Sequence, residues 1–146
     1  MTIWKQVSAL AVLLLSGCVT LGVGGRQTAS SSCSFDQVWD TAIVSLEGFR
    51  LQSADKAKGV LETDWVEVES ATRAGILQRD VNKERLKYVV EVKRDATGAI
   101  ATVLQRREEW SPMGNRMRQW RAMPGNSSEE KAVVAEMARR LKEKGC

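Results

Sequence analysis

Histidine is absent from this sequence of 146 residues. Histidine is the usual general base near neutral pH and the commonest metal ligand in proteins. Its absence excludes Ser-His-Asp and Cys-His catalytic sites, and the remaining carboxylates and cysteines show no spacing typical of a metal site. We therefore expect no catalytic residues, no metal and no enzyme activity.

A long hydrophobic run is also lacking. The mostly apolar stretch Val7–Leu15 has nine residues, whereas a transmembrane helix needs about 20. Nine residues after the positive charge of Lys5 are typical of a secretory signal peptide. The net charge is only +4, and it falls to about +3 once Lys5 leaves with the signal. Such a small charge gives no argument for a nucleic-acid partner, and we expect none.

Residues 15–18 (Leu-Ser-Gly-Cys) resemble a lipobox, the recognition site of bacterial lipoprotein processing. The resemblance implies that a signal peptide of residues 1–17 is removed. It also implies that Cys18 carries a diacylglycerol and an N-acyl chain such as palmitate, the only cofactor we expect, which anchors the chain to a membrane. In such lipoproteins an Asp directly after the lipidated cysteine favours retention in the inner membrane. This chain has Val19 at that position, which implies the outer membrane with the domain facing the periplasm. An ordinary signal with a chance cysteine is the alternative.

The chain after the signal divides into two parts. Residues 18–32 are rich in Gly, Ser, Thr and Ala without an apolar period, and this composition predicts a lipidated N-terminus and flexible tether. Residues 33–146 are expected to form a single domain, because the chain without its signal has the size of one domain.

Helical spacing predicts one helix at each end of this domain. Ser34–Gln37 and Ser127–Glu130 each match a capping box. Between the helices, β-prone segments separated by turns predict strands at 49–54, 60–68, 86–94 and 100–104, with a short one near 116–123. We expect an α+β fold, a two-layer sandwich in which a curved antiparallel sheet of about four to five strands has both helices on one face.

Three runs carry a family resemblance: residues 36–42 (DQVWDTA), 46–49 (LEGF) and 59–65 (GVLETDW). They resemble the repeated helix-grip domain of the BamC (NlpB) lipoproteins, accessory subunits of the outer-membrane β-barrel assembly machine. The shared motifs are a tryptophan on the first helix, a glycine turn and a G-x-hydrophobic-x-T-x-W strand. The resemblance implies a helix-grip fold and a setting in outer-membrane assembly or maintenance.

Two cysteines remain once Cys18 is lipidated. Cys33 precedes the first helix and Cys146 follows the second, so antiparallel helices would bring them together. Thiols tend to be oxidised in the periplasm, and we predict a disulfide. A free or intermolecular Cys146 is the alternative.

The stretch 110–123 combines two Trp, three Met and three Arg, residue types that are enriched at binding interfaces. We interpret it as a surface for a protein partner or an anionic envelope surface. The alternative is that the tryptophans cap the core while the arginines are solvated. Trp39 and Trp65, by contrast, are predicted to be core residues. The candidate partner-binding residues are Trp110, Met113, Arg116, Met117, Trp120 and Arg121.

Carboxylates offer little further chemistry. Glu108 and Glu109 are adjacent on a strand and should point to opposite faces. Glu62 and Asp64 share a predicted face and could bind a cation or a basic partner, although a solvated face is the simpler interpretation. We predict a noncatalytic, lipid-anchored lipoprotein that acts as a protein-interaction or accessory module of the cell envelope. The alternative is a periplasm-facing carrier that binds a small lipophilic ligand between helix and sheet.

Overall fold

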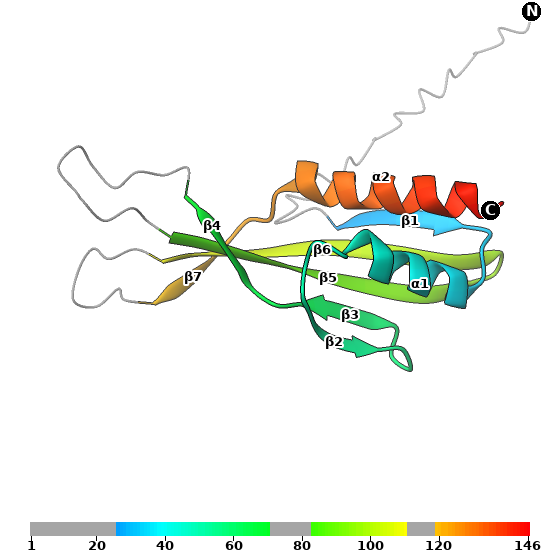
Figure 1. Cartoon of the computed structure of the whole chain (residues 1–146), viewed down its shortest axis with the longest axis horizontal. Helices are drawn as coiled ribbons and strands as arrows, with labels where there is room; N and C mark the ends of the chain where they lie inside the picture. Colours follow the sequence, from blue (N-terminus) through cyan, green and yellow to red (C-terminus); the bar gives the residue numbers. More distant parts are fainter. Residues whose placement is uncertain (1–25, 71–82, 111–118) are drawn as a thin grey trace, which may run out of the picture.

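The computed structural model describes residues 26–70, 83–110 and 119–146. These residues form two helices and a seven-stranded sheet whose pairings are all antiparallel, which confirms the α+β class (Figure 1). No helix in the described part of the chain is long and apolar enough to cross a membrane. In chain order the elements are β1 (Gln27–Ser31), α1 (Phe35–Ser45), β2 (Leu51–Asp55), β3 (Val60–Thr63), β4 (Val66–Glu69), β5 (Lys83–Asp95), β6 (Gly98–Trp110), β7 (Trp120–Met123) and α2 (Ser127–Glu143).

A long hairpin of β5 and β6 forms the centre of the sheet. Its two strands have 13 residues each and pair along their whole length, from Asp95 opposite Gly98 to Lys83 opposite Trp110. The order of the main path is β1-β6-β5-β3-β2. β4 pairs with β5 and β7 pairs with β6 at the open end of the hairpin. The hairpin therefore has a closed end near the turn and an open end flanked by two short strands.

The sheet has more strands than the sequence predicted, for two reasons. Residues 27–31, predicted to be part of the tether, form β1 and pair with residues 99–103 of β6. The predicted boundary between tether and domain at Cys33 was therefore wrong. The predicted strand 60–68 is interrupted at Asp64 and Trp65, which gives β3 and β4.

The two helices begin differently. At α1 the predicted capping box is present: the Ser34 hydroxyl accepts from the backbone N–H of Gln37, and the Gln37 side chain accepts from the backbone N–H of Ser34. At α2 the predicted box was placed one residue too late. The N-cap is Asn126, whose side chain accepts from the N–H of Ser128 at 3.0 Å. The backbone N–H of Asn126 is itself held by Gln105 of β6 at 2.8 Å, which fixes where the helix begins.

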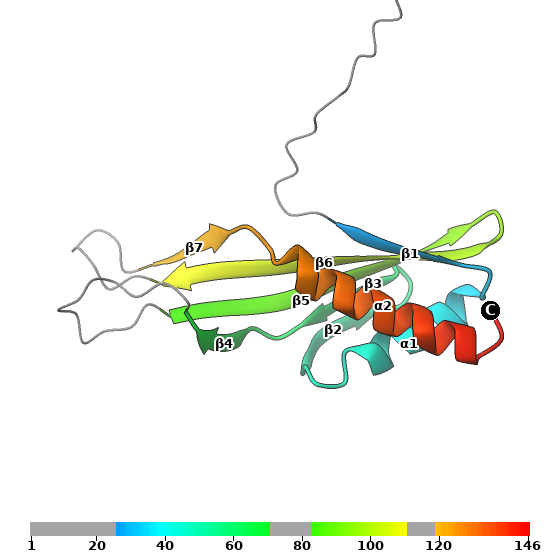
Figure 2. The ribbon, with the colours of Figure 1, turned by 90° about the horizontal axis from the view of Figure 1, so that it is seen from above.

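Both helices pack on one face of the sheet, nearer its closed end than its open end (Figures 1 and 2). Alternation directs every second residue of β5 and β6 toward the helices, and these residues are apolar from Leu86 to Val92 and from Ala99 to Val103. One continuous core results, and Trp39 belongs to it as predicted, with 3% of its surface exposed. The core residues are Cys33, Val38, Trp39, Ala42, Leu46, Leu61, Leu86, Tyr88, Val90, Val92, Ala99, Ala101, Val103, Met137 and Leu141.

The structure brings together the two cysteines that the sequence singled out. Cys33 and Cys146 are 113 residues apart in sequence, yet their Cα atoms are 5.2 Å apart and their sulfurs are at disulfide distance. Cys33 is buried just before α1, and Cys146 follows α2. The pair therefore links the start of one helix to the end of the other.

Candidate partner-binding site

The face of the sheet opposite the helices, here called the outer face, is charged and aromatic at the open end of the hairpin. Its side chains are those that alternate with the core residues of β5 and β6. Neither helix reaches this end of the sheet (Figure 2). The outer-face residues that lie opposite one another are Lys83 and Trp110, Arg85 and Glu108, Lys87 and Arg106, and Val89 and Leu104.

Arg85 lies at the centre of the outer face between two tryptophans. Its guanidinium carbon is 4.5 Å from the ring centroid of Trp65 and 4.2 Å from that of Trp120. Trp65 comes from the β5 side of the hairpin and Trp120 from the β6 side. Two N–H groups of Arg85 also donate to one carboxylate oxygen of Glu108, and the distance from Nε to this oxygen is 2.7 Å. Stacking and hydrogen bonding together hold this guanidinium in one orientation.

Lys87 extends the arrangement along β5. Its ammonium is paired with Glu62 of β3 and lies 4.9 Å from the ring centroid of Trp65. The Lys87 side chain is only 10% exposed, because the indole and the carboxylate cover it. Two cations therefore share one tryptophan ring, and each has its own carboxylate. We call Glu62, Trp65, Arg85, Lys87, Glu108 and Trp120 the tryptophan–arginine cluster.

Trp65 was predicted to be a core residue, and that prediction was wrong. Continued alternation from Leu61 and Thr63 would have pointed Trp65 toward the helices. Instead, the N–H of Asp64 donates to the carbonyl of Arg50 at 2.7 Å, and the chain leaves the β3 ladder at this point. After the break, the half-buried indole lies against the cations of the outer face.

Three of the six predicted partner-binding residues lie in the described part of the chain. Trp110 and Trp120 are directly opposite one another on β6 and β7, and both are half-buried. Arg121 is exposed and lies opposite Glu109. The other three, Met113, Arg116 and Met117, lie outside the described residues.

Sequence reasoning missed Arg85, Lys87 and Arg106. Their positions on the outer face follow from strand alternation together with the pairing of residues 83–95 with residues 98–110. The alternation was visible in the sequence. Which cations meet across the hairpin was not, because the predicted strands 86–94 and 100–104 stop short of the hairpin's open end.

A groove of about 350 Å³ opens beside this cluster. Trp65 stands on one side, and on the other runs the segment 122–125, which leads from β7 to α2. β6 contributes the remaining lining, including the outer-face residues Leu104, Arg106 and Glu108. We call this hollow the outer groove.

A buried polar network fixes the segment that borders the groove. β1 pairs with residues up to Val103 of β6 and β7 from Arg107 onward, so Gln105 falls in the gap between two neighbours. Glu130 of α2 fills the gap, because its carboxylate accepts from the backbone N–H of Gln105 at 2.8 Å. The Gln105 side chain donates to the hydroxyl of Tyr88 at 3.0 Å. Burial raises the pKa of that hydroxyl.

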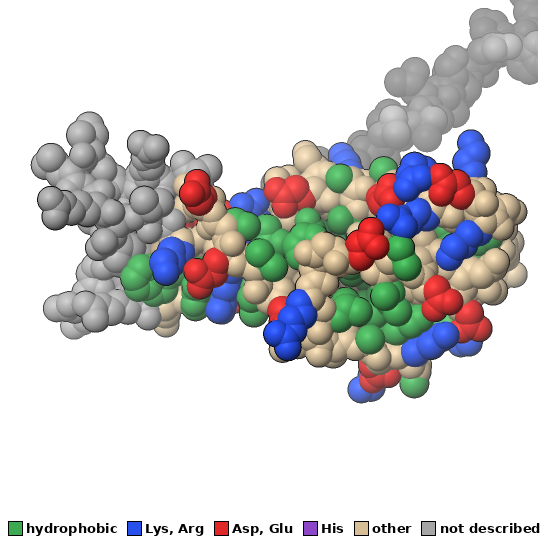
Figure 3. Space-filling model, viewed as in Figure 1, with side chains coloured by type: hydrophobic (Ala, Val, Ile, Leu, Met, Phe, Trp, Pro, Cys, Tyr) green, Lys and Arg blue, Asp and Glu red, His purple; other side chains and the backbone are tan. Residues whose placement is uncertain are grey.

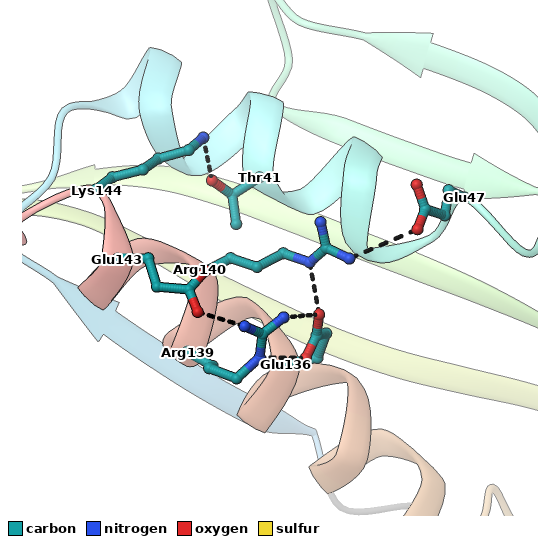
Figure 4. A network of polar contacts seen from close by, with 7 residues as sticks. All are labelled: Thr41, Glu47, Glu136, Arg139, Arg140, Glu143 and Lys144. Atoms are coloured by element: carbon teal, nitrogen blue, oxygen red, sulfur yellow. Dashed lines mark hydrogen bonds and ion pairs between the residues drawn. The ribbon is translucent and has the colours of Figure 1, made fainter.

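The helical side of the molecule has a different character. Charged side chains of both signs are interspersed over the helices (Figure 3). Within α2, Arg140 donates to Glu136 at 2.6 Å. Arg140 also lies 3.5 Å from Glu47, just after the end of α1, and Lys144 donates to the Thr41 hydroxyl at 2.8 Å (Figure 4). The last two contacts link the two helices, so we assign this network to holding the helix pair together.

Glu136 should make the stability of the helix pair sensitive to acid. Hydrogen bonds from Arg139 and then Arg140 lower its pKa from 4.5 to about 2. The pKa of Glu136 is lower in the folded state than in the unfolded state, so its ion pairs contribute to stability when the pH lies above the unfolded pKa. This contribution is lost as the pH falls through about 2. We expect Glu136→Gln to lower Tm slightly at pH 7, since exposed ion pairs are weak. Thermal melts at pH 7, 4 and 2 test this prediction. The Tm difference between the variant and wild type should disappear at pH 2. The same difference at all three pH values would show that it comes from packing.

Three carboxylates considered from the sequence are engaged in ion pairs. Glu62 is paired with Lys87, Asp64 lies 3.3 Å from Arg50, and Glu108 is held by Arg85. Among the described residues, no group of three or more His, Cys, Asp or Glu side chains is placed to hold a metal ion. Aromatic rings, oriented cations and a groove are features suited to recognition of another molecule.

Comparison with known proteins gives little further identification. No protein-family model matches the chain. No curated protein sequence matches it. Among solved structures, it is similar to a DUF4468 family protein from Bacteroides ovatus, with 13% sequence identity and a TM-score of 0.36 over 80% of this chain and 84% of that one. A likeness this distant transfers no function to the chain.

Proposed function

We propose that this chain is a noncatalytic, lipid-anchored module of the bacterial cell envelope that binds a protein partner through the outer face of its sheet. The observation that carries the proposal is the guanidinium of Arg85, held between Trp65 and Trp120 on a face that neither helix covers. Trp and Arg are among the residues that contribute most binding energy at protein interfaces. Side chains ordered before binding lose less conformational entropy when the complex forms.

The anchor in this proposal is Cys18, which would carry diacylglycerol and an N-acyl chain after removal of residues 1–17. β1 begins at Gln27, and a chain spans at most about 3.5 Å per residue, so the sheet would lie within roughly 30 Å of the lipid surface. The Cys33–Cys146 pair supports an oxidising compartment. The proposed location is therefore the periplasmic side of the outer membrane.

We also propose that the domain is of the helix-grip type found in BamC lipoproteins. Three features support this: Trp39 of α1 lies in the core, Gly59 forms the tight turn before β3, and two helices pack on one face of the sheet. Outer-membrane assembly or maintenance is the corresponding setting for the partner.

The alternative role as a carrier needs space between the helices and the sheet. In this region Val38, Ala42, Leu61, Val90 and Met137 each have no exposed surface and belong to one cluster. Side chains therefore fill the volume that a lipophilic ligand would need, and this observation favours the interaction module.

The proposal can be tested by photocrosslinking in cells. A photoreactive amino acid is placed at Trp65, Trp110 or Trp120, and at Lys56 in the β2–β3 turn as the control. We expect one discrete protein adduct from the three tryptophan positions and none from Lys56. Arg85→Gln should weaken the complex by about thirtyfold, the loss of a typical interface hot spot, and so reduce the adduct formed at Trp110.

Two results would contradict the proposal. The absence of a discrete adduct at all three tryptophan positions would remove the outer face as a binding surface. Cys18→Ala tests the anchor separately: the protein should lose labelled palmitate and leave the membrane fraction, and unchanged fractionation would contradict lipidation at this residue.

A further inference from the structure

Arg106 differs from the other charged side chains that line the outer groove. Glu108 is paired with Arg85, and Arg107 with Glu84 at 2.6 Å. Arg106 is exposed and, within the described part of the chain, its side chain takes part in no hydrogen bond, ion pair or ring contact. The groove therefore contains one guanidinium whose charge is not balanced by the described residues.

The residue opposite Arg106 across the hairpin is another cation, and not an acid that could balance its charge. Lys87 lies directly opposite Arg106 in the β5–β6 register. Like charges in that position destabilise a strand pair. Glu62 neutralises Lys87 from the β3 side, so Arg106 remains as the group that an anion entering the groove would meet.

Apolar side chains lie next to this cation. Leu104 is two residues away on the same strand and points to the same face, and Trp65, Met123 and Pro124 line the groove as well. A volume of about 350 Å³ is at the lower end of small-ligand sites. The space suits one or two side chains of an extended segment. Leu104 lines the groove together with Trp65 and the 122–125 segment, so a ligand contacts all of them by entering the groove.

We propose that the outer groove binds a peptide segment in which an Asp or Glu side chain lies next to an apolar side chain. Arg106 would bind the carboxylate through two parallel N–H···O bonds, and Trp65 and Leu104 would contact the apolar side chain. This inference rests on the proposed function, because it specifies the chemistry of the protein partner.

The test uses the full mature chain carrying Cys18→Ala and a pair of hexapeptides with blocked ends, Ser-Gly-Glu-Leu-Gly-Ser and the same peptide with Gln in place of Glu. Binding is followed by the NMR signals of the Arg106 Nε–H and the Trp65 indole N–H. We expect the Glu peptide to shift both signals and to bind at least tenfold more tightly than the Gln peptide.

Variants assign the preference to Arg106. Arg106→Gln should make the two peptides bind equally weakly, and Arg106→Lys should keep only part of the preference, since an ammonium cannot form the two parallel bonds. Arg94→Gln is the matched control, because Arg94 lies at the closed end of β5 over the ring of Phe35. It should leave the preference unchanged.

Three results would overturn the inference: equal binding of the two peptides to the wild-type chain, no shift of either signal at millimolar peptide, or a preference that survives Arg106→Gln. Phosphatidylglycerol vesicles that shift the Arg106 signal when neither peptide does would assign the groove to anionic lipid instead. If crosslinking from Trp65 still yields a discrete protein adduct, the proposed function stands and the carboxylate preference alone fails.

Discussion

Reducing the Cys33–Cys146 disulfide is expected to lower the free energy of unfolding by about 5 kcal/mol. The two cysteines are 113 residues apart in sequence, and in the chain-entropy model a closed loop of that length removes about 5 kcal/mol of conformational freedom from the unfolded chain. Most small domains have a total stability of about 5–15 kcal/mol. The reduced protein should therefore be marginally stable or unfolded.

The measurement is urea unfolding of residues 18–146 with Cys18→Ala, followed by far-UV circular dichroism with and without a reductant. Cys146→Ser offers a second route to the open form, because Cys146 is exposed and the change leaves buried Cys33 in place. Its unfolding midpoint should match that of the reduced wild type. Equal midpoints for oxidised and reduced wild type would show that the pair is not bonded in solution.

A stability this dependent on oxidation would have a consequence for the compartment. The domain would reach its full stability only where thiols are oxidised, as in the periplasm. In the cytosol the helices would lack the covalent link between the start of α1 and the end of α2. The predicted export signal and the observed cysteine pairing are therefore mutually consistent, although they depend on different parts of the chain.

Sequence patterns correctly predicted the elements that depend on residues close together in the sequence. The Ser34 box placed the start of α1 correctly, because cap and partner are three residues apart and need no tertiary contact. The alternation of residues 86–94 predicted β5, because one face is buried and one is not. Trp39 followed from the apolar stripe of the first helix.

Elements that depend on distant partners were not predictable in this way. β1 consists of small and polar residues, and it forms because β6 offers an open edge and Ala29 fits into the core side. The tendency of such residues to form a strand is set by tertiary context. Trp65 lies outside the core because the backbone N–H of Asp64 donates to the carbonyl of Arg50, a contact between distant residues that no periodicity reveals.

The candidate site also has one part that the sequence indicated and one part that depends on distant partners. The richness of residues 110–123 in Trp, Met and Arg pointed to the open end of the hairpin, where Trp110 and Trp120 lie opposite one another. Arg85 and Arg106 could not be found from composition. Each is one cation among many until the hairpin register places Arg85 opposite Glu108 and Arg106 opposite Lys87.

Replacing Gly59 by alanine is expected to destabilise the domain by at least about 3 kcal/mol, since it combines backbone strain with a steric clash. Gly59 has φ +69°, a conformation that costs residues with a side chain about 1–2 kcal/mol. A Cβ at this position would lie 2.2 Å from the backbone carbonyl oxygen of Val92. That carbonyl cannot retreat freely, because the N–H of Val92 donates to the carbonyl of Gly59 at 2.7 Å.

Variants of two other glycines separate the effect of backbone strain from the effect of the steric clash. Gly48 has an ordinary backbone conformation, and no atom lies within 4 Å of the position that a Cβ would take there, so Gly48→Ala should be neutral or stabilise by up to about 1 kcal/mol. Gly145 has φ +88° but open space around it, so Gly145→Ala should cost about 1–2 kcal/mol from strain alone. Urea unfolding followed by tryptophan fluorescence ranks the three variants. If Gly59→Ala lowers the free energy of unfolding by no more than Gly145→Ala, the backbone at Gly59 and Val92 can move apart to accommodate the Cβ at no further cost. A larger loss would instead show that the close approach of Gly59 to Val92 of β5 cannot relax.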